Sequence, residues 1–176
     1  FQQKMGGKIV VFDNGTGQLV GVRQLADEYL LSASAFDDYF DELKVEIEER
    51  MDRAEEGDYD FEPILIAVEG YQKMYEEITD LTANRLKTLI TMCEELKVYF
   101  VASENPDALK MLQAQEGIMK HMISNGVAVL TGGTFYSHNV FTSDIGYTEG
   151  NRPLGEFEAY LLQDGHLEKF KVMHEL

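Results

Sequence analysis

Four apolar runs of the sequence each end at a polar residue that could do chemistry. The first polar residues after these runs are Asp13, Glu69, Ser103 and Thr131. In open α/β sheets, ligands bind beyond the carboxyl ends of the parallel strands. Carboxylates there suit a metal ion and hydroxyls suit a phosphate, so the pattern predicts a phosphate or metal site. An exposed strand end also needs a polar residue, and position alone does not separate these two interpretations.

Two glycine-rich segments are candidates for phosphate binding, and both depart from the known patterns. In the segment 15–21, the third glycine of a dinucleotide-binding loop is replaced by Val20. The segment Gly6-Gly7-Lys8 comes before an apolar run, whereas a Walker A loop follows one and has Ser or Thr after its Lys. The four histidines show no pair at i, i+4 spacing and no carboxylate partner at ligand spacing, so we predict no zinc site. The sequence has no G-x-S-x-G elbow and no recognisable Ser/His/Asp set, so we predict no catalytic residue.

The polar residues are positioned by strands that alternate with helices. The apolar runs at 9–12, 64–68, 98–102 and 127–130 are typical of buried strands, and helical patterns separate them. This alternation predicts an α/β fold with a mostly parallel sheet flanked by helices. Near the C-terminus, Asp164-Gly165 lies between two short apolar segments, which predicts an antiparallel hairpin.

The segment 34–56 is predicted to be a long helix with two unlike faces. We expect Ser34 to begin it, with Asp37 three residues later in its first turn. Apolar residues at three- to four-residue spacing predict one buried face: Phe36, Phe40, Leu43, Ile47 and Met51. The other face is rich in Asp and Glu. It is either a solvated face or a surface for a partner.

Length and charge limit the classes of function. The 176 residues predict a single domain, 1–176. With 15 basic and 32 acidic residues the formal charge is −17, so we expect no direct contact with nucleic acid and none with an anionic membrane surface. No apolar run is long enough to span a membrane, and residues 1–7 do not form a signal peptide. The chain does not begin with Met, and we expect it to be a fragment of a longer protein.

The order of these segments resembles the FtsK/SpoIIIE branch of the RecA-like (P-loop NTPase-type) motor ATPases. Within that branch it is most similar to the C-terminal, degenerate ATPase domain of type VII secretion translocases of the EssC/YukB type. The resemblance covers nearly the whole chain. It depends on the order and spacing of the segments more than on any single motif. It rests on KIVVFDNGTGQL (8–19), FDDYFDELKVEIEERM (36–51), PILIAVEGYQKM (63–74), VYFVASENPDAL (98–109) and LGEFEAYLLQDGHLEKFKV (154–172).

The resemblance implies roles for three of the strand-end residues in binding a nucleotide. Glu69 falls on the first Walker B position, where the family has an Asp that orders Mg²⁺. Gly70 falls on the second, where the family has the Glu that polarises the attacking water. Ser103 falls on the sensor position and is followed by Glu104, where the family often has a neutral amide; Asp13 is the strand-end acid. A glycine has no carboxylate, so the resemblance implies a domain that has lost its hydrolytic base.

The family pattern also implies a Walker A loop ahead of Phe1. Its strand would lie in the sheet between those that carry Ser103 and Thr131, and residues 1–7 would end the helix after the loop. We therefore expect no cofactor on this fragment, and ATP with Mg²⁺ only if the upstream loop is present. The expected function is a structural, regulatory or substrate-contacting domain of a membrane-anchored type VII protein secretion ATPase.

The expected location is the cytoplasmic face of the cell membrane, reached only through the full-length protein. The expected partners are neighbouring ATPase domains of the same translocase and secreted protein substrates.

Two alternatives remain open. A receiver-like phosphoacceptor domain would also place acids at successive strand ends, but receivers have a phosphorylatable Asp where Glu69 stands and a Lys after the last strand. An enzyme of the Rossmann type would use the glycine turn at 15–21 to bind a dinucleotide.

Overall fold

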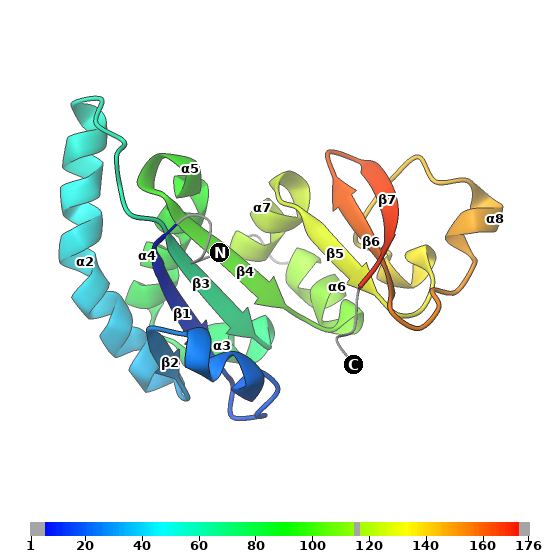
Figure 1. Cartoon of the computed structure of the whole chain (residues 1–176), viewed down its shortest axis with the longest axis horizontal. Helices are drawn as coiled ribbons and strands as arrows, with labels where there is room; N and C mark the ends of the chain where they lie inside the picture. Colours follow the sequence, from blue (N-terminus) through cyan, green and yellow to red (C-terminus); the bar gives the residue numbers. More distant parts are fainter. Residues whose placement is uncertain (1–5, 115–116, 173–176) are drawn as a thin grey trace. The chain divides into compact units, whose positions relative to one another are not determined.

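The computed structural model describes residues 6–114 and 117–172, and these form two compact units. The first lies within Phe1–Glu104 and the second within Asn105–Leu176. Each unit has its own sheet and its own buried residues (Figure 1). The single domain expected from the length remains a prediction.

A parallel sheet forms the first unit, with the strand order β2-β1-β3-β4. The pairings β2–β1, β1–β3 and β3–β4 are all parallel, so all four strands end at the same edge. The predicted strands at 9–12, 64–68 and 98–102 are confirmed. The elements in chain order are β1 (Lys8–Phe12), the 3₁₀ helix η1 (Val20–Leu25), β2 (Glu28–Leu30), α2 (Ala33–Glu55), β3 (Ile64–Glu69), α3 (Tyr71–Glu77), α4 (Asp80–Thr91), α5 (Cys93–Leu96) and β4 (Val98–Ser103).

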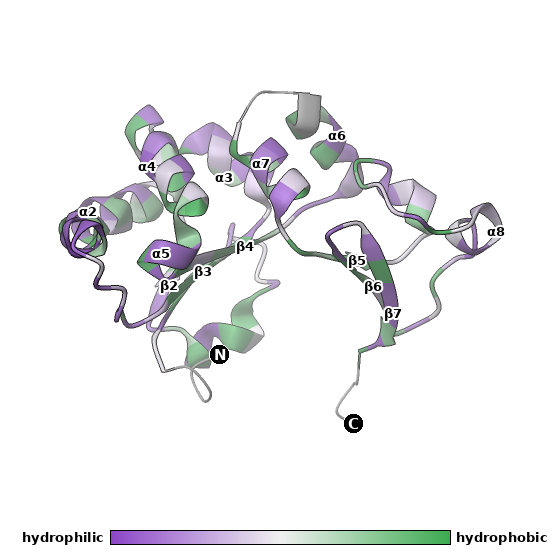
Figure 2. Ribbon diagram, turned by 90° about the horizontal axis from the view of Figure 1, so that it is seen from above, coloured by the Kyte–Doolittle hydropathy of each residue, from purple (hydrophilic) through white to green (hydrophobic). Residues whose placement is uncertain are grey.

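Helices α2 and α4 lie on the same side of this sheet (Figure 2). The buried stripe of α2 packs there, and the rings of Phe12 and Phe36 meet edge to face with their centroids 5.3 Å apart. Four of the five residues predicted for this stripe are buried, and Met51 is half-buried. The guanidinium of Arg50 is buried as well, because it donates to the carbonyl oxygens of Leu96 at 2.7 Å and Glu62 at 2.8 Å.

Helix α2 begins two residues earlier than the sequence predicts. Ser32 is the N-cap, and its hydroxyl accepts from the amide of Ala35 at 3.2 Å. The prediction that Ser34 begins the helix is therefore wrong. Asp37 does not cap α2, since its carboxylate accepts from the amide and the hydroxyl of Thr79, the residue that caps α4. None of the helices in the described ranges has the length and apolarity to cross a membrane.

The second unit contains an antiparallel sheet of order β5-β6-β7. The Asp164–Gly165 hairpin is confirmed, with both residues at positive φ (52° and 78°), as a type I′ turn requires. The prediction of a fourth parallel strand at 127–130 is wrong, since β5 pairs antiparallel with β6. The elements of this unit are α6 (Pro106–Ala114), α7 (Ile118–Asn125), β5 (Ala128–Thr131), η2 (Phe135–His138), α8 (Tyr147–Gly150), β6 (Glu158–Gln163) and β7 (His166–Lys171).

The sequence predicts the end of a helix at residues 1–7, and residues 1–5 lie outside the part of the chain that the structure describes. Gly6 and Gly7 have φ values of 63° and 105°, which are not helical.

Candidate functional site

Three of the four predicted strand-end residues come together in the first unit. Strands β1 and β3 are neighbours, with Phe12 opposite Val68, so Asp13 and Glu69 follow at the same edge. Strand β4 lies on the other side of β3, with Ser103 opposite Glu69. Thr131 ends β5 and belongs to the sheet of the second unit. The sequence therefore predicted the shared edge correctly for three residues and placed the fourth in the wrong sheet.

Asp13 is buried and its carboxylate holds the loop that follows β1. Its exposed fraction is 1%, one oxygen accepts from the hydroxyl of Tyr29, and the other accepts from the amide of Gly17 at 3.2 Å. The Tyr29 hydrogen bond is the largest influence and lowers the pKa of Asp13, although burial acts in the opposite direction. Both oxygens of this acid thus serve the fold of its own loop and of β2.

Glu69 is half-buried at the end of β3 and is held by the same loop. The hydroxyl of Thr16 donates to its Oε2 at 3.2 Å. Thr16 is part of the Asn14–Gly17 turn, in which Gly15 and Gly17 have positive φ. The loop is followed by the 3₁₀ helix η1, in which no residue is buried. A dinucleotide-binding loop leads into an α-helix instead, so this segment lacks the geometry of the Rossmann alternative.

Gly70 follows Glu69 in a backbone conformation that favours glycine. Its φ is 67° and its ψ is 62°, in the left-handed region. A Cβ built there would lie 2.6 Å from Nδ2 of Asn14. The amide of Asn14 is the end of a flexible side chain and can shift, so the left-handed backbone is the main reason why this position favours glycine.

Ser103 and Glu104 connect the end of β4 to the start of α3. The carbonyl of Ser103 accepts from the amide of Gly70 at 3.1 Å, and its side chain is exposed. A carboxylate oxygen of Glu104 accepts from the amide of Gln72 at 2.7 Å, in the first turn of α3. Sequence reasoning noted Glu104 only as a departure from the family pattern. It missed this contact because the two residues are 32 positions apart.

These groups do not fit the hydrolysis of Mg²⁺-bound ATP. At the position that the family resemblance assigns to the second Walker B residue, Gly70 has no carboxylate, and the amide of Asn14 lies beside it. Asp13 is fully used by Tyr29 and Gly17. Across residues 6–114 and 117–172, no group of three or more His, Cys, Asp or Glu side chains could hold a metal ion.

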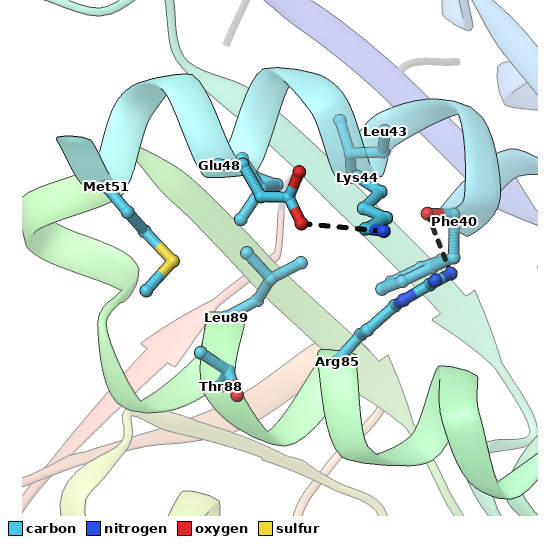
Figure 3. Close-up of a pocket in the computed structure, with 9 residues that line it drawn as sticks. Phe40, Leu43, Lys44, Glu48, Met51, Arg85, Thr88 and Leu89 are labelled. Carbon is cyan, nitrogen blue, oxygen red and sulfur yellow. Dashed lines mark hydrogen bonds and ion pairs between the residues drawn. The ribbon is translucent and has the colours of Figure 1, made fainter. Parts of the chain in front are cut away.

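A second feature of this unit is a slot between α2 and α4, which we call the α2–α4 slot (Figure 3). Its volume is about 160 Å³. The floor consists of Phe40, Leu43, Ile47 and Leu89, which are each less than a tenth exposed. The rim carries Lys44, Glu48, Met51, Arg85 and Thr88.

Known structures identify the fold. The chain superposes on EccC (ATPases 2 and 3) of Thermomonospora curvata with a TM-score of 0.72, at 11% identity, over 97% of this chain and 31% of that one. EssC (ATPases 2 and 3) of Geobacillus thermodenitrificans gives 0.74, at 14% identity, over 94% and 31%. The chain has the fold of the RecA-like ATPase domains of these secretion proteins.

The same RecA-like fold occurs in the pCW3 conjugation coupling protein TcpA, whose structure contains ATPγS. The TM-score is 0.66 at 13% identity, over 94% of this chain and 52% of that one. No protein-family model and no curated protein sequence matches the chain. The RecA-like chain spans about a third of the EccC and EssC chains that it matches.

Proposed function

We propose that this chain is a degenerate, non-hydrolytic RecA-like domain of a membrane-anchored type VII protein secretion ATPase, on the cytoplasmic face of the membrane. Its role is to contact secreted protein substrates and neighbouring ATPase domains. The observation that carries the proposal is Gly70. At the position that the family resemblance assigns to the hydrolytic Glu, this chain has a glycine at φ 67°, packed against Asn14.

Two further observations support the proposal. The structures that this chain resembles are ATPase domains 2 and 3 of EccC and EssC, and the EccC structure is a complex with a signal sequence peptide. The formal charge of −17 favours contact with proteins over contact with DNA, whose phosphates repel an acidic surface. The charge therefore favours protein secretion over the DNA transfer that the name of TcpA indicates.

The nucleotide part of the proposal concerns the Walker A loop. We propose that ATP and Mg²⁺ are bound only if such a loop stands upstream in the natural polypeptide. Strand β4 is the last strand of the described parallel sheet. A further strand beside it, as the family pattern requires, would pair with the backbone groups along this edge.

The secretion role is tested in the source cell. Deleting residues 1–176 from the natural polypeptide is expected to stop export of the proteins that depend on this ATPase, with the remaining protein still present on immunoblots. Glu69→Gln is the matched control and is expected to leave export unchanged, because the domain does not hydrolyse ATP. Normal export after the deletion would contradict the proposed role.

A further inference from the structure

The α2–α4 slot is apolar inside and has room for one large side chain. Its floor is aliphatic and aromatic, from Phe40, Leu43 and Ile47 on one helix and Leu89 on the other. Its volume of about 160 Å³ is close to that of engineered apolar cavities of about 150 Å³ that take up benzene. An anchor the size of Leu, Met or Phe therefore fits.

The rim of the slot carries Lys44, Arg85 and Glu48, and helix α2 beside it is acidic on balance. Helix α2 carries nine acidic and three basic residues. Its basic residues already have acidic neighbours, because Lys44 lies 3.6 Å from Glu48, Arg50 contacts Glu46, and Arg53 lies 2.6 Å from Asp58. On the α4 side, Arg85 pairs with Asp41 and donates to the carbonyl of Phe40 at 3.4 Å. These pairs also occupy Asp41 and Glu48, so Asp52 and Glu55 are the acids on this side of α2 that have no basic partner among the described residues.

The acids on the slot side of α2 form a stripe. Along α2, the residues at 41, 44, 48, 52 and 55 follow one another at three- or four-residue spacing, so they share one side of the helix. Four of the five are acidic, and Glu48 on this stripe also lies on the slot rim with a side chain that is 62% exposed. An occupant that inserts an apolar anchor would therefore place its flanking side chains beside carboxylates.

We propose that the α2–α4 slot binds a basic amphipathic helical segment of a secreted protein. An apolar residue on one face of that segment enters the slot, and Lys or Arg residues beside it pair with the acidic stripe. That the partner is a secreted protein rests on the proposed secretion role. That the segment is apolar on one face and basic on the other is inferred from the side chains of the slot and the stripe. Charge complementarity of this kind speeds association and weakens with salt, because the stripe is exposed.

The probe is a synthetic helical peptide with Leu on one face and Lys on the other, labelled for fluorescence anisotropy and titrated with the full chain. The double variant Glu48→Lys with Asp52→Lys is expected to weaken binding by about tenfold or more, since it reverses the stripe. Glu42→Lys with Glu49→Lys is the matched control. It makes the same change in net charge on the far side of α2 and is expected to change the affinity less than about twofold.

A second variant tests the apolar part of the slot. Thr88→Phe on the rim fills the slot and leaves the charge unchanged. It is expected to weaken binding of the probe by a factor similar to that of the Glu48→Lys with Asp52→Lys variant. The targeted side chains are exposed, so we expect the fold to persist, and circular dichroism and urea unfolding of each variant check this. A probe with Glu in place of Lys is expected not to bind.

Equal weakening by the two charge-reversal pairs would overturn the slot proposal, as would equal binding of the Glu probe or no effect of Thr88→Phe. These results would leave the secretion role standing. Normal export after deletion of residues 1–176 would instead remove the secretion role, whatever the peptide titrations give. The two failures are therefore distinguishable.

Discussion

The carboxyl edge of the parallel sheet and the α2–α4 slot differ in what their side chains do. At the sheet edge, where a RecA-like fold places its chemistry, the carboxylates of Asp13, Glu69 and Glu104 accept hydrogen bonds from the protein itself. At the slot, apolar side chains surround an open volume and acids line one side. The edge stabilises the fold, whereas the slot is the surface that we propose for a partner. In this chain the fold's usual site and this slot are different places.

Among variants that test the difference between the sheet edge and the slot, Asp13→Ala is expected to change the free energy of unfolding most. Removing the carboxylate leaves the amide of Gly17 and the hydroxyl of Tyr29 without their acceptor, which should cost about 2–4 kcal/mol in the free energy of unfolding. Urea unfolding followed by circular dichroism measures it. Asp38→Ala, on the polar side of α2, should change stability by less than about 0.5 kcal/mol. Equal losses in the two variants would show that the sheet edge is not structural.

Gly70→Ala comes next, with an expected loss of about 1–3 kcal/mol. The new Cβ has to occupy a left-handed backbone position and lies 2.6 Å from Nδ2 of Asn14. When Gly70→Ala is made in the Asn14→Ala variant, the loss of stability due to the contact with Asn14 should disappear. The loss due to the left-handed backbone should remain. A double-mutant cycle from urea unfolding separates the two. No coupling between the two substitutions would contradict the crowding that we describe.

A smaller effect is expected in the pH dependence of the unfolding free energy, to which the Asp13 carboxylate contributes. Its folded-state pKa is lowered, chiefly by the Tyr29 hydrogen bond, so its contribution is fully present above the unfolded-state pKa. The contribution is lost as pH falls from about 4 through the lower folded-state pKa. The difference in unfolding free energy between the wild type and Asp13→Asn should therefore be constant near neutral pH and shrink in acid. A difference that is constant or grows between about pH 6 and about pH 2 would contradict this assignment.

The smallest effect is expected at the slot. Thr88→Leu should add about 0.5–1 kcal/mol of stability, because the new methyl groups fill part of the open volume. Thr91→Leu is a matched control on the same helix, outside the residues that line the slot, and should show only the gain in helix propensity of a few tenths of a kcal/mol. Thermal unfolding of both variants compares them. Equal gains would mean that the slot is already filled.

The sequence was most informative where burial decides the structure. The apolar runs of β1 and β3 predict strands because these inner strands of the sheet are buried or half-buried, and the run of β4 predicts a strand although only Val98 of it is fully buried. Asp164-Gly165 predicts its hairpin from turn chemistry alone. Strand β2 was missed because its three residues, Glu28-Tyr29-Leu30, owe their pairing to β1 and to the contact of Tyr29 with Asp13. The direction of β5 was wrong because alternation of strands and helices does not say which strand becomes the neighbour.

The candidate site was predictable only in part. Strand ends gave the positions of Asp13, Glu69 and Ser103, since parallel strands share an edge. Tyr29 is 16 residues from its partner Asp13, and Thr16 is 53 residues from its partner Glu69. No local pattern identifies such contacts. The slot has no motif either. Its two sides come from α2 and α4, and each side alone has the ordinary periodicity of a buried helix face.

The central claim is that this RecA-like domain does not hydrolyse ATP. The most direct measurement is ATP turnover by the longest natural polypeptide that contains residues 1–176, compared between the wild type and Glu69→Gln at equal protein concentration. We predict equal rates, because the carboxylate of Glu69 is held by Thr16 and the next position is Gly70. Turnover that is lost in Glu69→Gln would contradict the account.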